Sequence, residues 1–260
     1  MARPEWLLVA VAAMVLSTVP TAQAASKLPS NFKRCAAADP KFNECLRGAV
    51  EDAFHKMVNG VPSLGVLPVD PLKVDRIKIN QGGGSVSLNM DLRNITITGL
   101  ADTKMLNYSA NLADATLDTA SLTRSLRLEF DHVITGRLLL LPIRGAGPGS
   151  ITLTQLLTGH KLKFVPKMKK DNLYWNIQDY YVKFVPKNIS IDFQGLFSDG
   201  RGDANLGEQL NRFMNQNAFL IFEEIGSAFE EAFSGVVKEV THRVFSRVPI
   251  ADIFVLGKKA

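Results

Sequence analysis

The sequence is poor in the features that mark several specialised protein classes. Glycine and proline occupy 19 and 12 positions without a periodic pattern, which excludes a collagen-like or low-complexity chain. The formal net charge of +5 on 260 residues is too dilute to indicate nucleic-acid binding. No apolar run approaches the ~20 residues that a membrane-spanning helix needs. A hydrophobic fraction of 46% still fills a substantial core, so we expect a folded globular domain.

Motifs for catalysis and metal binding are also missing. The four histidines (His55, His132, His160 and His242) are scattered and form no H-E-x-x-H motif, which argues against a zinc hydrolase. There is no G-x-S-x-G nucleophile elbow. The glycine-rich stretch 145–150 ends in serine where a dinucleotide-binding loop requires glycine. We therefore predict a protein that is not an enzyme and that has neither a metal nor a cofactor.

The first 24 residues are typical of a secretory signal peptide. Arg3 provides the positive charge, residues 6–16 form an apolar run, and Ala22-Gln23-Ala24 matches a cleavage site. The apolar run is too short to span a bilayer, so cleavage is favoured over its alternative, an uncleaved anchor. We predict that residues 1–24 are removed and that residues 25–260 form a single elongated, extracellular domain.

Two further features of the sequence are typical of a secreted protein. Cys35 and Cys45 are the only cysteines, and we expect them to form a disulfide in an oxidising compartment. Three Asn-x-Ser/Thr sequons begin at Asn94, Asn107 and Asn188 and are predicted glycosylation sites.

The hydrophobic pattern divides the chain into a helix, a long β region and a second helical region. Apolar residues at three- and four-residue spacing predict a helix that begins near Asp39-Pro40 and ends at Asn59-Gly60. Between residues 74 and 193 the period is two, with one apolar and one polar face, which predicts an antiparallel sheet covered on one side. The alternation slips at Arg93-Asn94, where we expect a β-bulge.

The C-terminal region, residues 205–246, returns to helical spacing. Its apolar residues recur at every fourth position, which exceeds the ~3.6 residues of a helical turn, so the apolar stripe winds around the helix. A winding stripe suits a helix enclosed by a curved sheet, with Phe229 inside and Glu230 on the opposite, solvent-facing side. Gly226 and Gly235 are the expected sites of a kink. The apolar interior between sheet and helix either packs solid or holds an apolar guest.

Several ordered motifs resemble the insect takeout and haemolymph juvenile hormone-binding protein family. The resemblance covers nearly the whole mature chain, and its most specific part is Gly136-Arg137 followed by the apolar run 138–143. The other matching segments are 28–45 with both cysteines, 60–66, Asp70-Pro71-Leu72, 94–100, 211–217 and 245–254. Ala218 replaces an expected tryptophan, and the single cysteine pair is more similar to the takeout branch than to the hormone-binding branch.

The resemblance implies an α+β fold of the α/β-wrap, TULIP-like type. In this fold a long curved antiparallel sheet wraps around a long C-terminal helix and a shorter N-terminal helix joins it. It also implies a monomeric carrier for a small hydrophobic ligand, such as a juvenile hormone-like terpenoid or a fatty acid, in an internal tunnel. Apolar and aromatic side chains are the candidate tunnel wall: Tyr108, Phe130, Leu138, Leu140, Trp175, Tyr181, Phe184, Phe222, Ile225, Phe229 and Phe233. The candidate polar contacts to the ligand are Tyr108, Thr135, Gln155 and Tyr181.

One dense basic patch supports an alternative function. Lys161, Lys163, Lys167, Lys169 and Lys170 lie within ten residues of one another. A solvated sheet face explains them most simply. Transient contact with an anionic membrane or a receptor is the other interpretation, and it would suit a host-defence protein that binds bacterial or anionic lipids.

Overall fold

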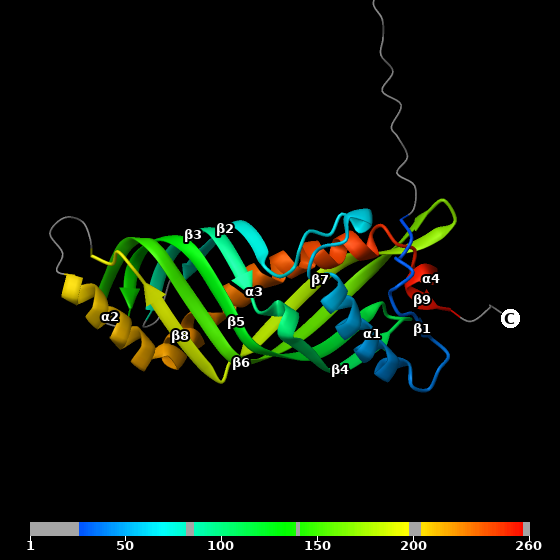
Figure 1. Ribbon diagram of the computed structural model, residues 1–260, viewed down its shortest axis with the longest axis horizontal. Coiled ribbons are helices and arrows are strands. Elements are labelled where there is room, and N and C mark those ends of the chain that lie inside the picture. The colour runs from blue at the N-terminus through cyan, green and yellow to red at the C-terminus, as the bar shows by residue number, and fades with distance from the viewer. Residues whose placement is uncertain (1–25, 82–85, 139–140, 198–203, 257–260) are drawn as a thin grey trace, which may run out of the picture.

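The computed structural model shows an elongated molecule in which a long sheet curls around a helix (Figure 1). The structure describes residues 26–81, 86–138, 141–197 and 204–256. The predicted signal peptide and Leu140 lie outside these ranges.

A seven-stranded antiparallel sheet forms most of the molecule. Its central strands β5 (Thr116–Leu138) and β6 (Leu141–Lys169) are 23 and 29 residues long, so each pairs with different partners along its length. On one side β5 pairs first with β4 and then with β3, and on the other side β6 pairs with β8 and then with β7. The remaining strands are β2 (Leu72–Gln81), β3 (Val86–Thr98), β4 (Thr103–Asn111), β7 (Asn172–Val185) and β8 (Asn188–Phe193).

Burial alternates along the strands, as the two-residue period predicts. In β3, buried residues alternate with more exposed ones up to Arg93, and the alternation resumes at Ile95. The register with β5 shifts between Arg93 and Thr96, and Asn94 has a left-handed backbone (φ 52°), which confirms the predicted bulge. The glycine-rich stretch 145–150 lies within β6, so it is a strand segment and not a loop.

Two helices follow the sheet, α2 (Ala204–Gln216) and α3 (Ala218–Phe245). Helix α3 contacts both β2 and β7, which are the two ends of the main strand order, and this is possible only because the sheet curls around it (Figure 1). Helix α3 runs through both Gly226 and Gly235, so neither glycine interrupts the helix. The helical region is interrupted at Asn217, whose side-chain amide donates to the Phe213 carbonyl oxygen at 2.8 Å.

Polar side chains of both helices pair with the backbone of edge strands. Asn211 accepts from Phe193 N–H at 2.9 Å and donates back to the Phe193 carbonyl at 2.8 Å, and Asn215 makes the same pair of bonds with Ile191. These bonds satisfy backbone groups of β8 that an unpaired edge would leave open. They account for two of the three asparagines in the segment 211–217, and the third, Asn217, bonds to the helix backbone.

Glu230 of α3 likewise forms hydrogen bonds with the edge strand β7. Its carboxylate accepts from Phe184 N–H at 2.9 Å and from Lys183 Nζ at 3.2 Å, and Ser234 Oγ accepts from Val182 N–H at 3.0 Å. Glu230 is only 7% exposed. The expectation that Glu230 faces solvent is therefore wrong, because the curled sheet meets α3 on this side as well.

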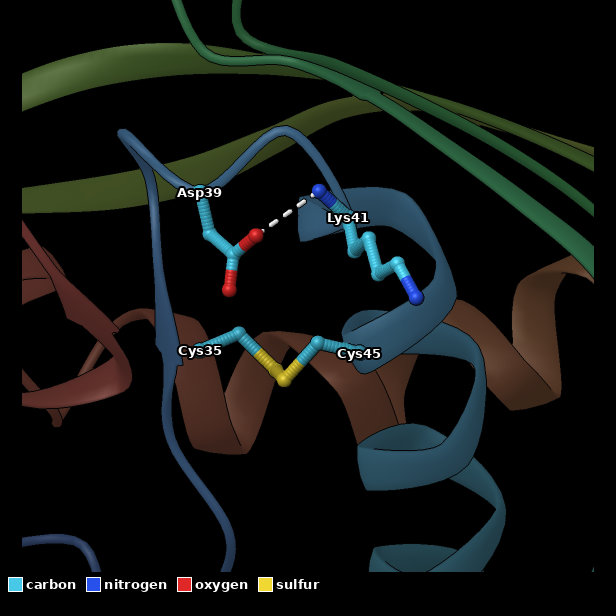
Figure 2. Close-up of a disulfide and its surroundings, with 4 residues drawn as sticks. All are labelled: Cys35, Asp39, Lys41 and Cys45. Carbon is cyan, nitrogen blue, oxygen red and sulfur yellow. Dashed lines mark hydrogen bonds between the residues drawn. A yellow bond between two sulfur atoms is a disulfide. The ribbon is translucent and has the colours of Figure 1, made fainter.

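The N-terminal helix α1 (Phe42–Lys56) covers the end of the sheet near β4. It begins two residues after Pro40, and the Asp39 carboxylate accepts from Lys41 N–H at 2.8 Å in the turn that precedes it (Figure 2). The predicted disulfide joins Cys35 in β1 (Cys35–Ala36) to Cys45 in α1 (Figure 2). Strand β1 pairs in parallel with β9 (Phe254–Val255), which follows the short helix α4 (Ile250–Ile253), so both ends of the described chain meet beside α1.

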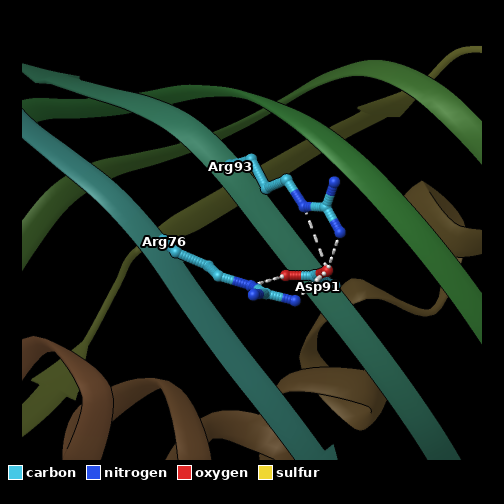
Figure 3. Close-up of polar contacts among 3 residues, drawn as sticks. All are labelled: Arg76, Asp91 and Arg93. Atoms are coloured by element: carbon cyan, nitrogen blue, oxygen red, sulfur yellow. Dashed lines mark hydrogen bonds and ion pairs between the residues drawn. The ribbon is translucent and has the colours of Figure 1, made fainter.

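The outer face of the sheet is polar. On it Asp91 accepts from both Arg76 and Arg93, at distances between 2.6 and 3.1 Å (Figure 3). The hydrogen bonds from Arg76 and then from Arg93 hold the pKa of the Asp91 carboxyl well below its usual range. Both arginines are solvent-exposed, so we assign the triad little stabilising effect. The three predicted glycosylation sites, Asn94, Asn107 and Asn188, are exposed as well.

Candidate functional site

An apolar cavity of about 250 Å³ lies between α1, α3 and the inner face of the sheet. Strands β4 to β7 provide one wall, α1 and the C-terminal half of α3 provide others, and the segment before β1 closes one side. Among the lining residues that the structure describes, Lys33 carries the only formal charge, and it is exposed. An apolar wall of this kind suits an apolar molecule.

A second, smaller cavity of about 50 Å³ lies further along α3, against β2, β5, β6 and β8. The two cavities share three lining residues, Leu126, Phe184 and Phe233. The rings of Phe184 and Phe233 meet edge to face with centroids 5.1 Å apart. These side chains separate two volumes that would otherwise be continuous along the helix, and we refer to Leu126, Phe184 and Phe233 as the partition.

Six of the eleven candidate wall residues line one or both cavities. Tyr108, Phe184 and Phe233 line the larger cavity, and the smaller one is lined by Phe184, Phe222, Ile225, Phe229 and Phe233. Helix α3 therefore presents its winding apolar stripe to both cavities in turn.

Four other candidates lie elsewhere. Phe130 packs against His132 and Phe193, and Leu138 is buried in the core at the far end of β5. Trp175 is buried among Phe164, Phe245 and Phe254. These three side chains are buried but do not line either apolar cavity. The fourth, Tyr181, is 64% exposed, so its assignment to the tunnel wall is wrong.

A bulge in the sheet accounts for the error at Tyr181. Lys163 pairs with Asp179 and Phe164 pairs with Ile177, so one extra residue stands in β7 between these pairs. Odd-numbered residues such as Trp175 face inward before the bulge and outward after it.

The larger cavity also has polar wall residues that the sequence argument missed. His160 Nδ1 lies 3.1 Å from Tyr180 Oη, and His160 Nε2 lies 3.3 Å from Ser121 Oγ. Thr103 and Thr123 form a buried hydroxyl pair at 2.8 Å. Of the polar contacts that were expected, Tyr108 lines the cavity, whereas Thr135, Gln155 and Tyr181 are exposed. The two-residue period could have predicted Ser121 and His160. Each lies an even number of residues from buried neighbours in its strand and therefore faces the inner side of the sheet.

Burial sets the protonation states in this wall. It lowers the pKa of His160 from 6.5 to about 4, and it raises the pKa values of Tyr108 and Tyr180 well above their ordinary value of 10. At physiological pH these three side chains are therefore neutral. Across the described ranges, no group of histidine, cysteine, aspartate or glutamate side chains is arranged to hold a metal ion. Nor does any helix within those ranges have the length and apolarity to cross a membrane.

A curved antiparallel sheet rolled around a long helix, with apolar cavities between them, defines an α/β-wrap protein. The family model described as haemolymph juvenile hormone binding protein (JHBP) matches residues 8–255. The chain therefore belongs to the takeout and haemolymph juvenile hormone binding protein family, which confirms the resemblance inferred from its motifs. This is a family of binding proteins.

Individual relatives agree in sequence and in fold. The circadian clock-controlled protein daywake of Drosophila melanogaster is 27% identical over 247 residues, which cover 89% of this chain and 90% of daywake. A putative beta-carotene-binding protein of Schistocerca gregaria is 22% identical over 221 residues, covering 84% and 86% of the two chains. The crystal structure of Epiphyas postvittana Takeout 1 matches with a TM-score of 0.74 at 23% identity, over 86% of this chain and 99% of that one. This match confirms the predicted fold.

Proposed function

We propose that the protein is a secreted, monomeric carrier that encloses a small hydrophobic molecule in the larger apolar cavity. The observation that carries the proposal is the cavity itself, which is walled by apolar side chains of α1, α3 and four strands. A juvenile hormone-like terpenoid, a fatty acid or a related lipid has the required apolar body. The Schistocerca gregaria relative, a putative beta-carotene-binding protein, is consistent with such a ligand.

The mechanism is burial and involves no reaction. Each methylene group that leaves water for the cavity contributes about 0.8 kcal/mol. The ligand's loss of translational and conformational freedom offsets several kcal/mol of this gain. Affinity should therefore increase with chain length until the cavity is full.

Filling the cavity from the α1 side tests the proposal. Ala53 of α1 lines the cavity, so Ala53→Trp should occupy the ligand's volume. Gly48, in the same helix, is exposed and has open space around the position of a Cβ atom, so Gly48→Trp is the matched control. We expect Ala53→Trp to weaken binding of a fluorescent apolar probe at least tenfold, and Gly48→Trp to bind like the wild type. Equal binding by all three proteins would place the ligand outside this cavity.

A second candidate function, docking on anionic membranes, is supported by the outer face of β6 and β7. Lys161, Lys163 and Lys167 are exposed there, close to the exposed apolar side chains of Val165 (47%) and Tyr181 (64%). Each lysine near an anionic surface contributes about 1 kcal/mol. Binding to phosphatidylserine vesicles that salt abolishes, with no binding to phosphatidylcholine vesicles, would support this function. Equal binding to both kinds of vesicle would contradict it.

A further inference from the structure

The larger cavity has a group of polar side chains that a purely hydrocarbon ligand would leave unused. Tyr108, Ser121, His160 and Tyr180, here called the polar cluster, come from the four neighbouring strands β4, β5, β6 and β7, and all four line the cavity. Polar groups that face an apolar interior destabilise a protein unless they find hydrogen-bond partners. The partners of these four groups therefore indicate what the cavity is built to hold.

His160 links two hydroxyl groups into one chain of hydrogen bonds. Its Nδ1 contacts Tyr180 Oη at 3.1 Å and its Nε2 contacts Ser121 Oγ at 3.3 Å. A neutral imidazole has one donor and one acceptor nitrogen, so the chain runs in one direction or the other. Ser121 consequently offers a ligand either its hydroxyl hydrogen or a lone pair. Tyr180, at the other end, also interacts with the Thr241 hydroxyl.

Tyr108 adds a second hydrogen-bond donor to the same wall. Its hydroxyl has no hydrogen-bond partner among the described residues, and burial raises its pKa, so the proton stays in place. An oxygen atom of a ligand inside the cavity would provide the missing acceptor.

The electrostatics of the wall restrict the charge of that oxygen. Lys33 is the one charged side chain among the described lining residues, and it is exposed. Burial lowers the pKa of His160, so this side chain provides no positive charge near neutral pH. A carboxylate at the polar cluster would therefore be buried without a counter-ion, which is strongly unfavourable.

We propose that the polar cluster binds an uncharged oxygen of an otherwise apolar ligand, such as that of an alcohol, a ketone or an ester, and that it disfavours a carboxylate. This inference rests on the proposed carrier function and specifies the chemical class of its ligand.

Three probes of equal chain length test the inference: tetradecanol, tetradecane and tetradecanoate. Each is titrated at pH 8 against wild type, Tyr108→Phe and Ser121→Ala by displacement of a fluorescent apolar probe. Tyr181→Phe is the matched control, because it removes the same hydroxyl group from an exposed position outside the cavity. We expect each cluster variant to weaken tetradecanol binding about three- to tenfold, as the loss of one hydrogen bond does. Tetradecane and tetradecanoate binding should not change, and Tyr181→Phe should behave like the wild type.

Each alternative result has a distinct meaning. If the two cluster variants leave tetradecanol binding unchanged while all probes still bind, the carrier function stands and the polar cluster has no role in recognition. If they weaken tetradecane or tetradecanoate as much as tetradecanol, the selectivity for an uncharged oxygen is refuted. If wild type binds none of the three probes, the proposed function itself fails.

Discussion

The partition between the two cavities leads to a quantitative prediction about ligand length. Phe233 is 7% exposed, lines both cavities, and closes the gap between them together with Phe184. Phe233→Ala should join the 250 and 50 Å³ cavities into one volume enlarged by the missing ring. Two further methylene groups buried in that space would contribute about 1.6 kcal/mol, or roughly fifteenfold in affinity.

The assay compares straight-chain alcohols of increasing length by probe displacement. For the wild type, affinity should rise with length and then fall, and for Phe233→Ala the maximum should move to longer chains. Phe193→Ala is the control, because this buried ring lines neither apolar cavity. Each substitution removes a buried phenylalanine and should lower stability by about 3–5 kcal/mol, so binding is measured on samples that thermal unfolding shows to be folded. An unchanged length optimum in folded Phe233→Ala would refute the role of the partition.

Three further predictions concern stability. Thiol labelling of the denatured, unreduced protein should find neither Cys35 nor Cys45 free, and replacing both by alanine should lower the unfolding free energy by roughly 2 to 3 kcal/mol, as the short loop between them implies. Labelling of both cysteines would contradict secretion together with the disulfide. Glu230→Ala should destabilise the protein by about 1–3 kcal/mol in urea unfolding, because it leaves a buried N–H of β7 without its acceptor, whereas the neighbouring and exposed Glu231→Ala should have little effect. Equal effects at the two positions would refute this edge contact. Burial lowers the pKa of His160 from 6.5 to about 4, so the unfolded chain binds the proton first as the pH falls. Stability should therefore decrease between pH 6.5 and about 4, and the decrease should be smaller in His160→Gln, whereas an identical decrease in both proteins would show that His160 is not the group responsible.

The sequence pattern predicted the layers of the fold well, because burial on one face of a strand is recorded residue by residue. The bulge at Arg93-Asn94 was visible as a slip in the alternation. The bulge in β7 was not predicted, and Tyr181 was therefore assigned to the wrong face of the sheet. The buried face of helix α3 was harder to predict, because the sheet contacts this helix on more than one side. An acidic residue such as Glu230 can therefore be buried by pairing with the backbone of an edge strand.

The candidate site was only partly predictable for a different physical reason. Hydrophobicity alone does not distinguish a side chain in solid core from one that faces a cavity, since both are buried and apolar. Trp175 and Phe184 illustrate this: the first is packed among aromatic rings, and the second borders both cavities. The polar wall residue His160 was not predicted, because a single histidine in a strand matches no catalytic or metal-binding motif. The alternation of inward and outward residues along β6 would have placed His160 on the inner face of the sheet.

The most direct test of a carrier function is to ask what the protein holds when it is made by cells. Wild type and Ala53→Trp would be secreted from insect cells, purified to the same folded state and extracted with organic solvent for quantitative mass spectrometry. We expect an apolar compound with an uncharged oxygen, close to one molecule per wild-type protein, and a large loss of that compound in Ala53→Trp. Folded wild type that yields no such compound, or equal yields from the two proteins, would contradict this expectation.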